Sequence, residues 1–242
     1  MKQPKLSVAI ITFQEADRVE RCLRSVQFAD EILVVDSGST DQTQQIARDL
    51  GARVVVHPFE GHVEQKNIAL SECTHDWVLC IDADEWLSPE LGQAIQHWLR
   101  TATGATGLKM IRRNLWLGRM THFGVFGKAS VLRLVPKSKA QWVGANPHDQ
   151  LSIQGETEQI EGVLWHEPYR SYQDHLQTID RYAEIASREL QPSIWRLWTH
   201  PPAHFVRSYI LKLGFLDGGV GLILSILGSY YVWLKYWRAG RR

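Results

Sequence analysis

Four short apolar runs stand out in the first third of the chain. They are rich in β-branched residues and continuous rather than alternating with polar positions, and they cover residues 6–12, 31–36, 52–57 and 76–82. Strands buried on both faces of a parallel sheet have this pattern, because neither face meets water. The pattern therefore predicts four strands of a parallel sheet.

The segments between these runs have helical spacing. Residues 15–26 place four apolar side chains on one helical face, at Val19, Cys22, Leu23 and Val26. Residues 39–52 offer Ser39 or Thr40 as an N-cap and Gly51 as a stop, and residues 64–73 fill the third gap. Alternating strands and helices predict βαβ units, whose strands end along one edge of the sheet. Ligands of such sheets bind along that edge.

The pattern changes after residue 88. Ser88 and Pro89 predict the start of a helix that runs to about Arg100. Residues 101–168 contain short strands separated by Gly- and Pro-containing loops, which predicts a mixed or antiparallel extension of the sheet. A helix follows from Ser171, with Asp174 in a capping position and an apolar stripe at Leu176, Ile179, Tyr182, Ala183, Ala186 and Leu190.

The C-terminal segment differs in charge from the rest. Residues 195–242 hold seven Lys or Arg and one acid, which gives a net charge of +6, whereas residues 1–194 have a net charge of −5. Residues 218–234 are 17 positions without a charge, followed by aromatic and basic residues. This mixture favours a shallow or monotopic membrane helix at a cytoplasmic face. The alternative is a buried C-terminal core helix. Nucleic-acid binding is disfavoured, because aliphatic residues interrupt the basic ones.

Composition bounds the class of protein. With 44% hydrophobic and 22% charged residues among 242, the chain is typical of a folded protein. Its three cysteines fit neither a disulfide framework nor a zinc site, so we expect reduced core thiols. The N-terminal apolar run is short and lacks a cleavage site, which argues against a secretory signal. We therefore expect a cytoplasmic body.

Two aspartates follow the fourth predicted strand. Asp82 and Asp84 are separated by one residue, so in an extended segment their side chains point the same way and repel each other unless a cation lies between them. Carboxylate oxygens suit Mg²⁺ or Mn²⁺. As a bare pattern Asp-x-Asp is most often a solvated turn, but its place on the ligand-binding edge indicates a metal site. We expect Glu85 to face solvent.

Polar residues also end the first two strands. Thr12, Glu15 and Asp36 offer acceptors to the same crevice, a pattern that suits a base and ribose, although residues 38–41 also fit a plain loop and helix cap. We expect the Asp36 carboxylate to be free to meet a ligand. The sequence has no Gly-rich phosphate loop, so a phosphate-bearing ligand would need a metal ion or a basic residue such as Lys66.

Several stretches together resemble glycosyltransferase family 2, in particular the bacterial lipopolysaccharide core glucosyltransferases. They include "VVDSGSTDQTQQIA", "QKNIALSECTHDWVLCIDADE" and "WHEPYRSYQDHL". The resemblance covers nearly the whole chain. It implies an α/β fold of the GT-A type with a mostly parallel central sheet, a nucleotide-diphosphate sugar donor such as UDP-glucose, a divalent metal (Mn²⁺ or Mg²⁺) and inversion at the anomeric carbon.

The resemblance also implies residue roles. Thr12, Glu15 and Asp36 match nucleoside-contacting positions, and Lys66 matches a basic residue near the nucleotide. Asp82 and Asp84 match the D-x-D signature, in which the first carboxylate lies near ribose and metal and the second binds the metal. His166 matches a histidine that reaches the metal or the diphosphate, but a strand-end histidine bonded to backbone is an equal alternative. Asp149, beside His148, matches the position of the catalytic base.

These expectations combine into one hypothesis. Residues 1–192 form a GT-A catalytic domain, with a nucleotide-binding half (1–100), an acceptor half (101–170) and a helix (171–192), and residues 193–242 form a helical tail that associates with the inner face of the cytoplasmic membrane. The enzyme moves a sugar, in our hypothesis glucose, onto a membrane-linked glycan such as the lipopolysaccharide inner core. The alternatives are a polyprenyl-phosphate glycosyltransferase and a non-catalytic membrane-associated nucleotide-sugar binding module.

Overall fold

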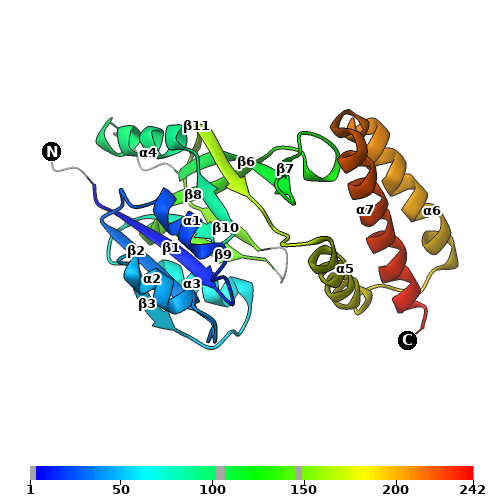
Figure 1. Cartoon of the computed structure of the whole chain (residues 1–242), viewed down its shortest axis with the longest axis horizontal. Coiled ribbons are helices and arrows are strands. Elements are labelled where there is room, and N and C mark those ends of the chain that lie inside the picture. The colour runs from blue at the N-terminus through cyan, green and yellow to red at the C-terminus, as the bar shows by residue number, and fades with distance from the viewer. Residues whose placement is uncertain (1–3, 102–106, 145–148, 242) are drawn as a thin grey trace. The chain divides into compact units, whose positions relative to one another are not determined.

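The computed structural model describes residues 4–101, 107–144 and 149–241 (Figure 1). The chain forms two compact units. The first unit comprises Met1–Arg112 and Ala129–His166, and the second comprises Arg113–Lys128 and Glu167–Arg242.

The first unit is an α/β structure. Its strands are β1 (Leu6–Thr12), β2 (Glu31–Asp36), β3 (Arg53–Val56), β4 (Trp77–Asp82), β5 (Glu85–Leu87), most of β6 (Gly107–Trp116), β8 (Ala129–Pro136), β9 (Ala140–Val143), β10 (Gln150–Ile153) and β11 (Thr157–His166). Its helices are α1 (Val19–Ser25), α2 (Thr43–Asp49), α3 (His62–Glu72), α4 (Pro89–Thr101) and the short η2 (Lys137–Lys139).

The main sheet has the strand order β3-β2-β1-β4-β8-β6-β11-β5. The first four strands are parallel, with Thr12 beside Asp36 and Ile11 beside Asp82. β8 pairs antiparallel with both β4 and β6, and β11 pairs antiparallel with β5. The predicted strands and the antiparallel extension are therefore confirmed. A separate hairpin joins β9 and β10.

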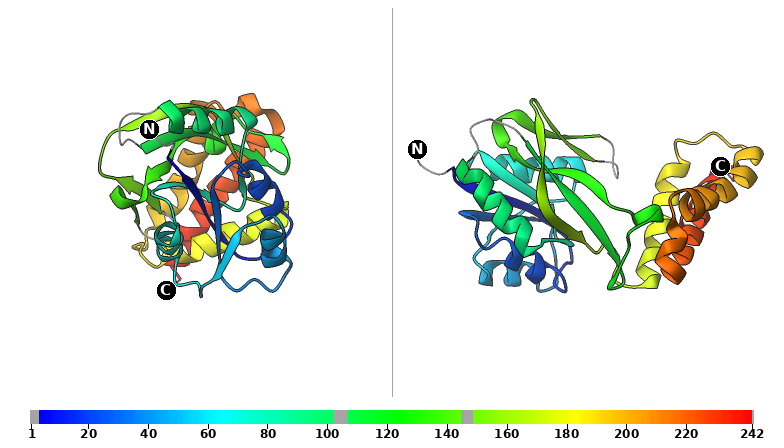
Figure 2. Two further views of the ribbon diagram at one scale, coloured as in Figure 1. Left: turned by 90° about the vertical axis from the view of Figure 1, so that its left-hand side faces the viewer. Right: turned by 90° about the horizontal axis from the view of Figure 1, so that it is seen from above.

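Alternate residues of β1 serve two cores, one on each face of the sheet. Leu6, Val8 and Ile10 pack with α1, α2 and α4 on one face. Ala9 packs with α3 and Trp142 on the other face. The continuous apolar run of β1 follows from this arrangement, because both faces of the strand pack against other parts of the protein. Figure 2 shows helices against both faces of the sheet.

Helix boundaries test the predicted caps. α4 begins at Pro89, and the Leu91 amide donates to Ser88 Oγ over 3.3 Å, as expected. The N-cap assignment of Ser39 or Thr40 is wrong: α2 begins at Thr43 after Gln42. The reason is local competition, since the Ser39 hydroxyl donates to Asp36 Oδ2 instead of accepting from the helix.

The three cysteines are buried and free, as expected for core thiols. Burial raises the pKa of Cys73 and of Cys80 to about 12. Both are therefore protonated and weak nucleophiles near neutral pH.

The second unit is mostly helical. It contains β7 (Arg119–Met120), which pairs with the end of β6, and the helices η1 (Gly124–Phe126), α5 (Tyr172–Ser187), α6 (Ile194–Phe205), the π-helical η3 (Val206–Leu211), η4 (Gly214–Asp217) and α7 (Gly218–Ala239). α5 and α6 both pack on α7, as the yellow, orange and red ribbons of Figure 2 show. The sequence predicts a helical segment over residues 193–242 but not its division into α6, η3, η4 and α7.

The start of α5 confirms its predicted cap. Ser171 Oγ accepts from the Asp174 amide over 3.0 Å, and Asp174 Oδ2 accepts from the Arg170 amide. Of the predicted stripe, Ile179 and Ala183 are buried in the core of the unit, whereas Leu190 lies beyond the end of the helix.

α7 contains the predicted apolar segment 218–234 and continues to Ala239. Among the described residues, one helical stretch, Gly214–Ala239, is long and apolar enough to cross a membrane, and 28% of its apolar window is buried in the protein. Length and composition alone are weak evidence for a span, because a core helix of a soluble protein meets the same criteria.

An aromatic cluster surrounds His175 in this unit. Trp116 Nε1 donates to His175 Nδ1 over 3.1 Å, and the Tyr169 ring stacks on the imidazole with centroids 3.8 Å apart. Burial lowers the pKa of His175 to about 4, although Asp174 acts in the opposite direction. The imidazole is therefore neutral near pH 7.

Candidate active site

The carboxylate of Asp82 lies at the carboxyl end of β4 between two cations. Lys66 Nζ is 2.9 Å from Asp82 Oδ1, and Arg133 Nη2 is 3.3 Å from Asp82 Oδ2. Burial by itself raises the pKa of Asp82, but Lys66 and Arg133 outweigh it and hold that pKa well below its ordinary value. Asp82 is therefore an anion whose charge is already shared by protein groups.

Lys66 joins Asp82 to the candidate base. Its Nζ is also 2.8 Å from Asp149 Oδ2, and it lies over the Trp142 ring at 4.4 Å. α3 carries Lys66, and the loop before β10 carries Asp149, so two segments distant in sequence meet at one ammonium group. His148, beside the candidate base, lies outside the described residues.

Glu85 corrects one expectation. It was expected to face solvent, but its side chain is fully buried. Arg133 Nη2 donates to Glu85 Oε1 over 2.6 Å, and Glu85 Oε2 accepts from the Asp82 amide. Arg112 is 3.4 Å from the same Oε1. The residue is buried because two strands that are far away in sequence bring guanidinium groups to it.

Asp84 and His166 meet at the turn between β4 and β5. His166 pairs with Glu85 in the β11–β5 ladder, and its Nε2 is 3.4 Å from Asp84 Oδ2. Burial raises the pKa of Asp84, but the neighbouring His166 outweighs it, and the net shift is downward. The structure thus brings together two of the three residues expected to bind metal, Asp84 and His166.

These residues fit a divalent cation that shares its shell with substrate. A carboxylate oxygen and an imidazole nitrogen are both suitable ligands. In the described part of the chain, no group of three or more His, Cys, Asp or Glu side chains is arranged to hold a metal. Mg²⁺ sites of this kind take one or two carboxylates and fill the remaining positions with water and substrate phosphate.

Asp36 is not free in this structure, contrary to expectation. Oδ2 accepts from Thr12 Oγ1 and from Ser39 Oγ at 2.8 and 2.6 Å. Oδ1 accepts from the Ser39 amide and from Gln44 Nε2, each at 2.7 Å. The side chain is fully buried, and donors from the end of β1, from its own loop and from α2 satisfy both of its oxygens. Asp36 therefore organises the loop after β2, and its role in nucleotide binding stays a prediction.

The loop after β1 is fastened to the loop after β2. Gln14 has a positive φ of 56°, and its amide donates to Ser39 Oγ over 2.8 Å. The Glu15 amide donates to Thr43 Oγ1, and the Glu15 carboxylate pairs with Arg18 at 2.8 Å. Thr12 and Asp36 are thus held together at adjacent strand ends, as the predicted nucleoside site requires.

Arg133 was not predicted as a site residue from the sequence, although its guanidinium group pairs with both Asp82 and Glu85. A signal was present: Arg133 is a single charged residue inside the apolar run "SVLRLV". A lone charge on a buried strand needs a partner. The partner itself could not be read from the sequence, because it depends on which strand lies beside β8.

The comparisons with known proteins agree with this architecture. The Glycosyl transferase family 2 model matches residues 7–131. An uncharacterized glycosyltransferase of Rickettsia conorii is 33% identical, covering 96% of this chain and 88% of its own. The lipopolysaccharide core biosynthesis glycosyltransferase LpsC of Rhizobium meliloti is 27% identical, covering 95% of this chain and 89% of its own.

A solved structure gives a weaker likeness. Glucosyl-3-phosphoglycerate synthase from Mycobacterium tuberculosis is 29% identical over 46% of this chain and 44% of that chain, with a TM-score of 0.40. The family match and the α/β sheet identify the fold as GT-A-like, with its parallel strands followed by an antiparallel extension. The chain belongs to glycosyl transferase family 2 and is a glycosyltransferase.

Proposed function

We propose that the chain is an inverting, metal-dependent hexosyltransferase. It moves glucose from UDP-glucose onto a hydroxyl group of a membrane-linked glycan such as the lipopolysaccharide inner core. The observation that carries this proposal is the junction at the end of β4, where Lys66 contacts both Asp82 and Asp149 while Asp84 contacts His166. The likeness to LpsC over 95% of the chain supports the class of acceptor.

The donor nucleotide lies across the ends of β1 and β2 in this proposal. Thr12, Glu15 and Asp36 form the edge that meets the nucleoside. Lys66 supplies positive charge to the diphosphate, since the chain has no Gly-rich loop to do so. Asp82 divides its interactions between Lys66, Arg133 and the ribose side of the donor.

Asp84 and His166 would hold a divalent cation, with Asp82 beside them. When bound, such a cation offsets the negative charge that grows on the departing diphosphate. Asp84 is held as a carboxylate by the histidine at 3.4 Å, which supports its role as a ligand.

Asp149 acts as the general base. It takes the proton of the acceptor hydroxyl while that oxygen forms a bond to the anomeric carbon. The bond between this carbon and the diphosphate oxygen breaks on the opposite face, so the configuration inverts and UDP leaves. Lys66 positions the Asp149 carboxylate beside Asp82, the first carboxylate of the signature.

The C-terminal segment brings the enzyme to its acceptor. Residues 193–242 form the membrane-associating segment and residues 1–192 the catalytic one, at the inner face of the cytoplasmic membrane. An apolar helix and a net positive charge in this segment support the assignment. Holding enzyme and lipid-linked acceptor at one surface raises their local concentration.

The deciding experiment measures UDP-glucose consumption with Mn²⁺, with and without truncated lipopolysaccharide. We expect acceptor-dependent turnover that EDTA and Asp84→Ala abolish, whereas Asp49→Ala, a control at an exposed carboxylate, retains activity. Full activity in EDTA would exclude the metal role. Transfer to isoprenyl phosphate instead would make the chain a polyprenyl-phosphate glycosyltransferase. Tight UDP binding without transfer would make it a non-catalytic binding module.

A further inference from the structure

The second unit exposes an unusual amount of apolar surface. The described residues include 21 exposed large hydrophobic side chains, and 13 of them fall within residues 194–230. They are Ile194, Trp195, Trp198, Val206, Ile210, Leu211, Leu213, Phe215, Leu216, Leu222, Ile223, Ile226 and Tyr230. Scattered exposed hydrophobic residues are ordinary, but a concentration of this kind marks an interaction surface.

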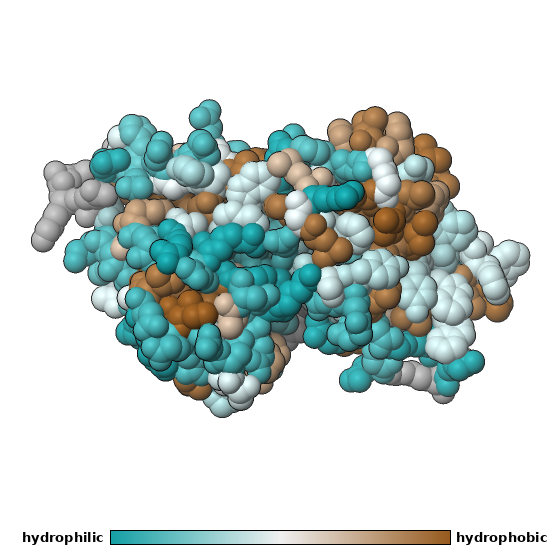
Figure 3. Space-filling view, viewed as in Figure 1, coloured by the Kyte–Doolittle hydropathy of each residue, from teal (hydrophilic) through white to brown (hydrophobic). Residues whose placement is uncertain are grey.

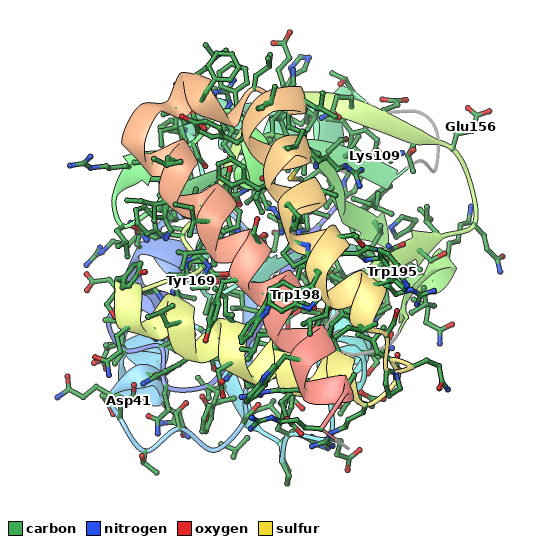
Figure 4. All side chains as sticks on the ribbon, turned by 90° about the vertical axis from the view of Figure 1, so that its right-hand side faces the viewer. Asp41, Lys109, Glu156, Tyr169, Trp195 and Trp198 are labelled. Carbon is green, nitrogen blue, oxygen red and sulfur yellow. The ribbon has the colours of Figure 1, made fainter. Side chains whose placement is uncertain are left out.

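The spacing along α6 aligns these residues. Ile194, Trp198, Pro202 and Val206 recur every four positions, and Trp195 adjoins them, so they form one stripe. No residue of α6 is buried, and Trp195 and Trp198 are 78% and 66% exposed. Figure 4 labels both tryptophans on this helix. The opposite side of α6 contacts α7, where Tyr236 lies 3.0 Å from His200.

The stripe continues beyond α6. η3 and η4 add Ile210, Leu211, Phe215 and Leu216, and the brown residues of Figure 3 gather over this part of the unit. We call the exposed apolar residues of 194–216 and their basic neighbours the basic–apolar face. Its basic neighbours are Arg196, Arg207 and Lys212, all exposed. Arg196 is four positions before His200, so it borders the apolar stripe on the side of α7 and does not belong to the stripe itself.

The charge of this face has one sign. Residues 190–216 contain no Asp or Glu. The next acid, Asp217, is occupied, because it accepts from the His122 and Phe123 amides at 3.0 and 2.9 Å. A partner that fits must be apolar inside and negatively charged at its surface. An anionic lipid bilayer has both properties, and tryptophan favours the boundary between them.

We infer that the basic–apolar face lies in one leaflet of an anionic bilayer, with the rings of Trp195 and Trp198 at the headgroup boundary and with Arg196, Arg207 and Lys212 against lipid phosphates. This deepens the proposed function by locating the membrane contact in α6, η3 and η4 rather than in α7. The segment lies on the membrane and does not cross it, because a span would bury Arg196, His200, His204 and Arg207 in hydrocarbon.

The test measures flotation of the whole chain with vesicles, in the absence of donor and acceptor. One vesicle type is phosphatidylcholine alone, and the other also contains phosphatidylglycerol. We expect binding to the mixed vesicles only, weakened by added salt. The double variant Trp195→Glu, Trp198→Glu should lose binding at least about tenfold. The control Phe59→Glu, in the first unit and 52% exposed, should bind as the unchanged chain does.

A second pair of variants tests the charge. Arg196→Gln and Arg207→Gln should each weaken binding about fivefold on anionic vesicles. Alkaline carbonate should release the bound protein, whereas retention would indicate that α7 spans the bilayer and would overturn the inference. Equal binding to both vesicle types, or unchanged binding by the tryptophan variant, would also overturn it. Lipid-independent dimers that the tryptophan variant abolishes would assign the face to a second copy of the chain.

Vesicle binding and sugar transfer can fail separately. If the chain floats with vesicles but transfers no sugar, the proposed function fails and this inference stands. If UDP-glucose is consumed with soluble acceptor but no vesicles are bound, the reverse holds.

Discussion

The two units of the chain depart from ordinary burial in opposite directions. The first unit buries charge: Glu85 and Arg133 are almost completely buried, and Lys66 lies beside two carboxylates. The second unit exposes apolar side chains, with Trp195 the most exposed of the large ones. Charged residues are rarely buried and contiguous apolar surface is rarely exposed. Each departure coincides with the place where we propose that the unit meets a ligand.

The buried charges of the first unit and the exposed apolar residues of the second unit are unfavourable for different reasons. Buried charges cost stability unless every one is paired, so the first unit must hold its ion pairs in a fixed arrangement. Exposed apolar residues cost solubility rather than internal order, so the second unit needs only a packed interior beneath them. Variants should therefore damage the first unit through folding and the second through association.

The largest effect is expected from Arg133→Met. It leaves the buried Glu85 with the Asp82 amide and the more distant guanidinium of Arg112 at 3.4 Å, and the free energy of unfolding should fall by about 3–5 kcal/mol. Denaturant titration measures the loss. Arg24→Met is the control, because its pair with Glu20 is exposed and should contribute less than about 0.5 kcal/mol. If both variants lost the same free energy of unfolding, the buried ion pairs would contribute no more to stability than the exposed pair does.

The second unit should lose stability in acid. Burial lowers the pKa of His175 to about 4 in the folded chain, whereas the unfolded chain keeps the ordinary value of 6.5. The unfolded state therefore binds the proton first, and stability falls as pH drops from about 6.5 to 4, by at most about 3 kcal/mol.

Unfolding curves between pH 7 and pH 4, followed by tryptophan fluorescence, measure this slope. His175→Gln keeps an acceptor for Trp116 but does not titrate, so its slope in this range should be smaller. An unchanged slope would mean that other groups cause the acid sensitivity.

A smaller effect is expected at Lys66, whose ammonium group contacts the carboxylates of both Asp82 and Asp149. If the donor diphosphate uses Lys66, then Asp149 competes with it for the same charge. Asp149→Asn should therefore tighten UDP binding about fivefold while abolishing transfer. The gain should disappear in a Lys66→Met background, as calorimetry of all four variants would reveal. Weaker binding by Asp149→Asn would contradict the competition.

The smallest effects concern helix starts in the second unit. Ser171→Ala should lower the free energy of unfolding by about 1 kcal/mol. Ser171 Oγ accepts from the Asp174 amide, and Asp174 Oδ2 in turn accepts from the Arg170 amide, so the first turn of α5 is capped by both residues. Ser193→Ala should cost about half as much, because its bond to the Arg196 amide is 3.3 Å long. Thermal unfolding measures both, and the reverse order would show that α6 depends on its cap more than on its contacts with α7.

The sequence allowed the parallel strands to be predicted within one residue, because strand burial on two faces leaves a continuous apolar run. The same reasoning placed Asp36, Asp82 and Asp84 along one edge, whereas His166 was expected there only from the family resemblance. It failed where a side chain's surroundings depend on strands distant in sequence, as for Glu85 beside Arg133. It also failed for Asp36 and Ser39, whose donors and acceptors pair within their own loop instead of serving a ligand or a helix.

The order of strands in the sheet has a consequence for how the protein folds. Arg133 is 51 positions from Asp82, and Asp149 is 83 positions from Lys66. The first four strands can pair early, because each βαβ unit is local, but the guanidinium of Arg133 reaches Asp82 only when β8 joins the sheet. A growing chain that has not yet produced β8 therefore has the parallel strands but lacks Arg133, the residue that pairs with both Asp82 and Glu85.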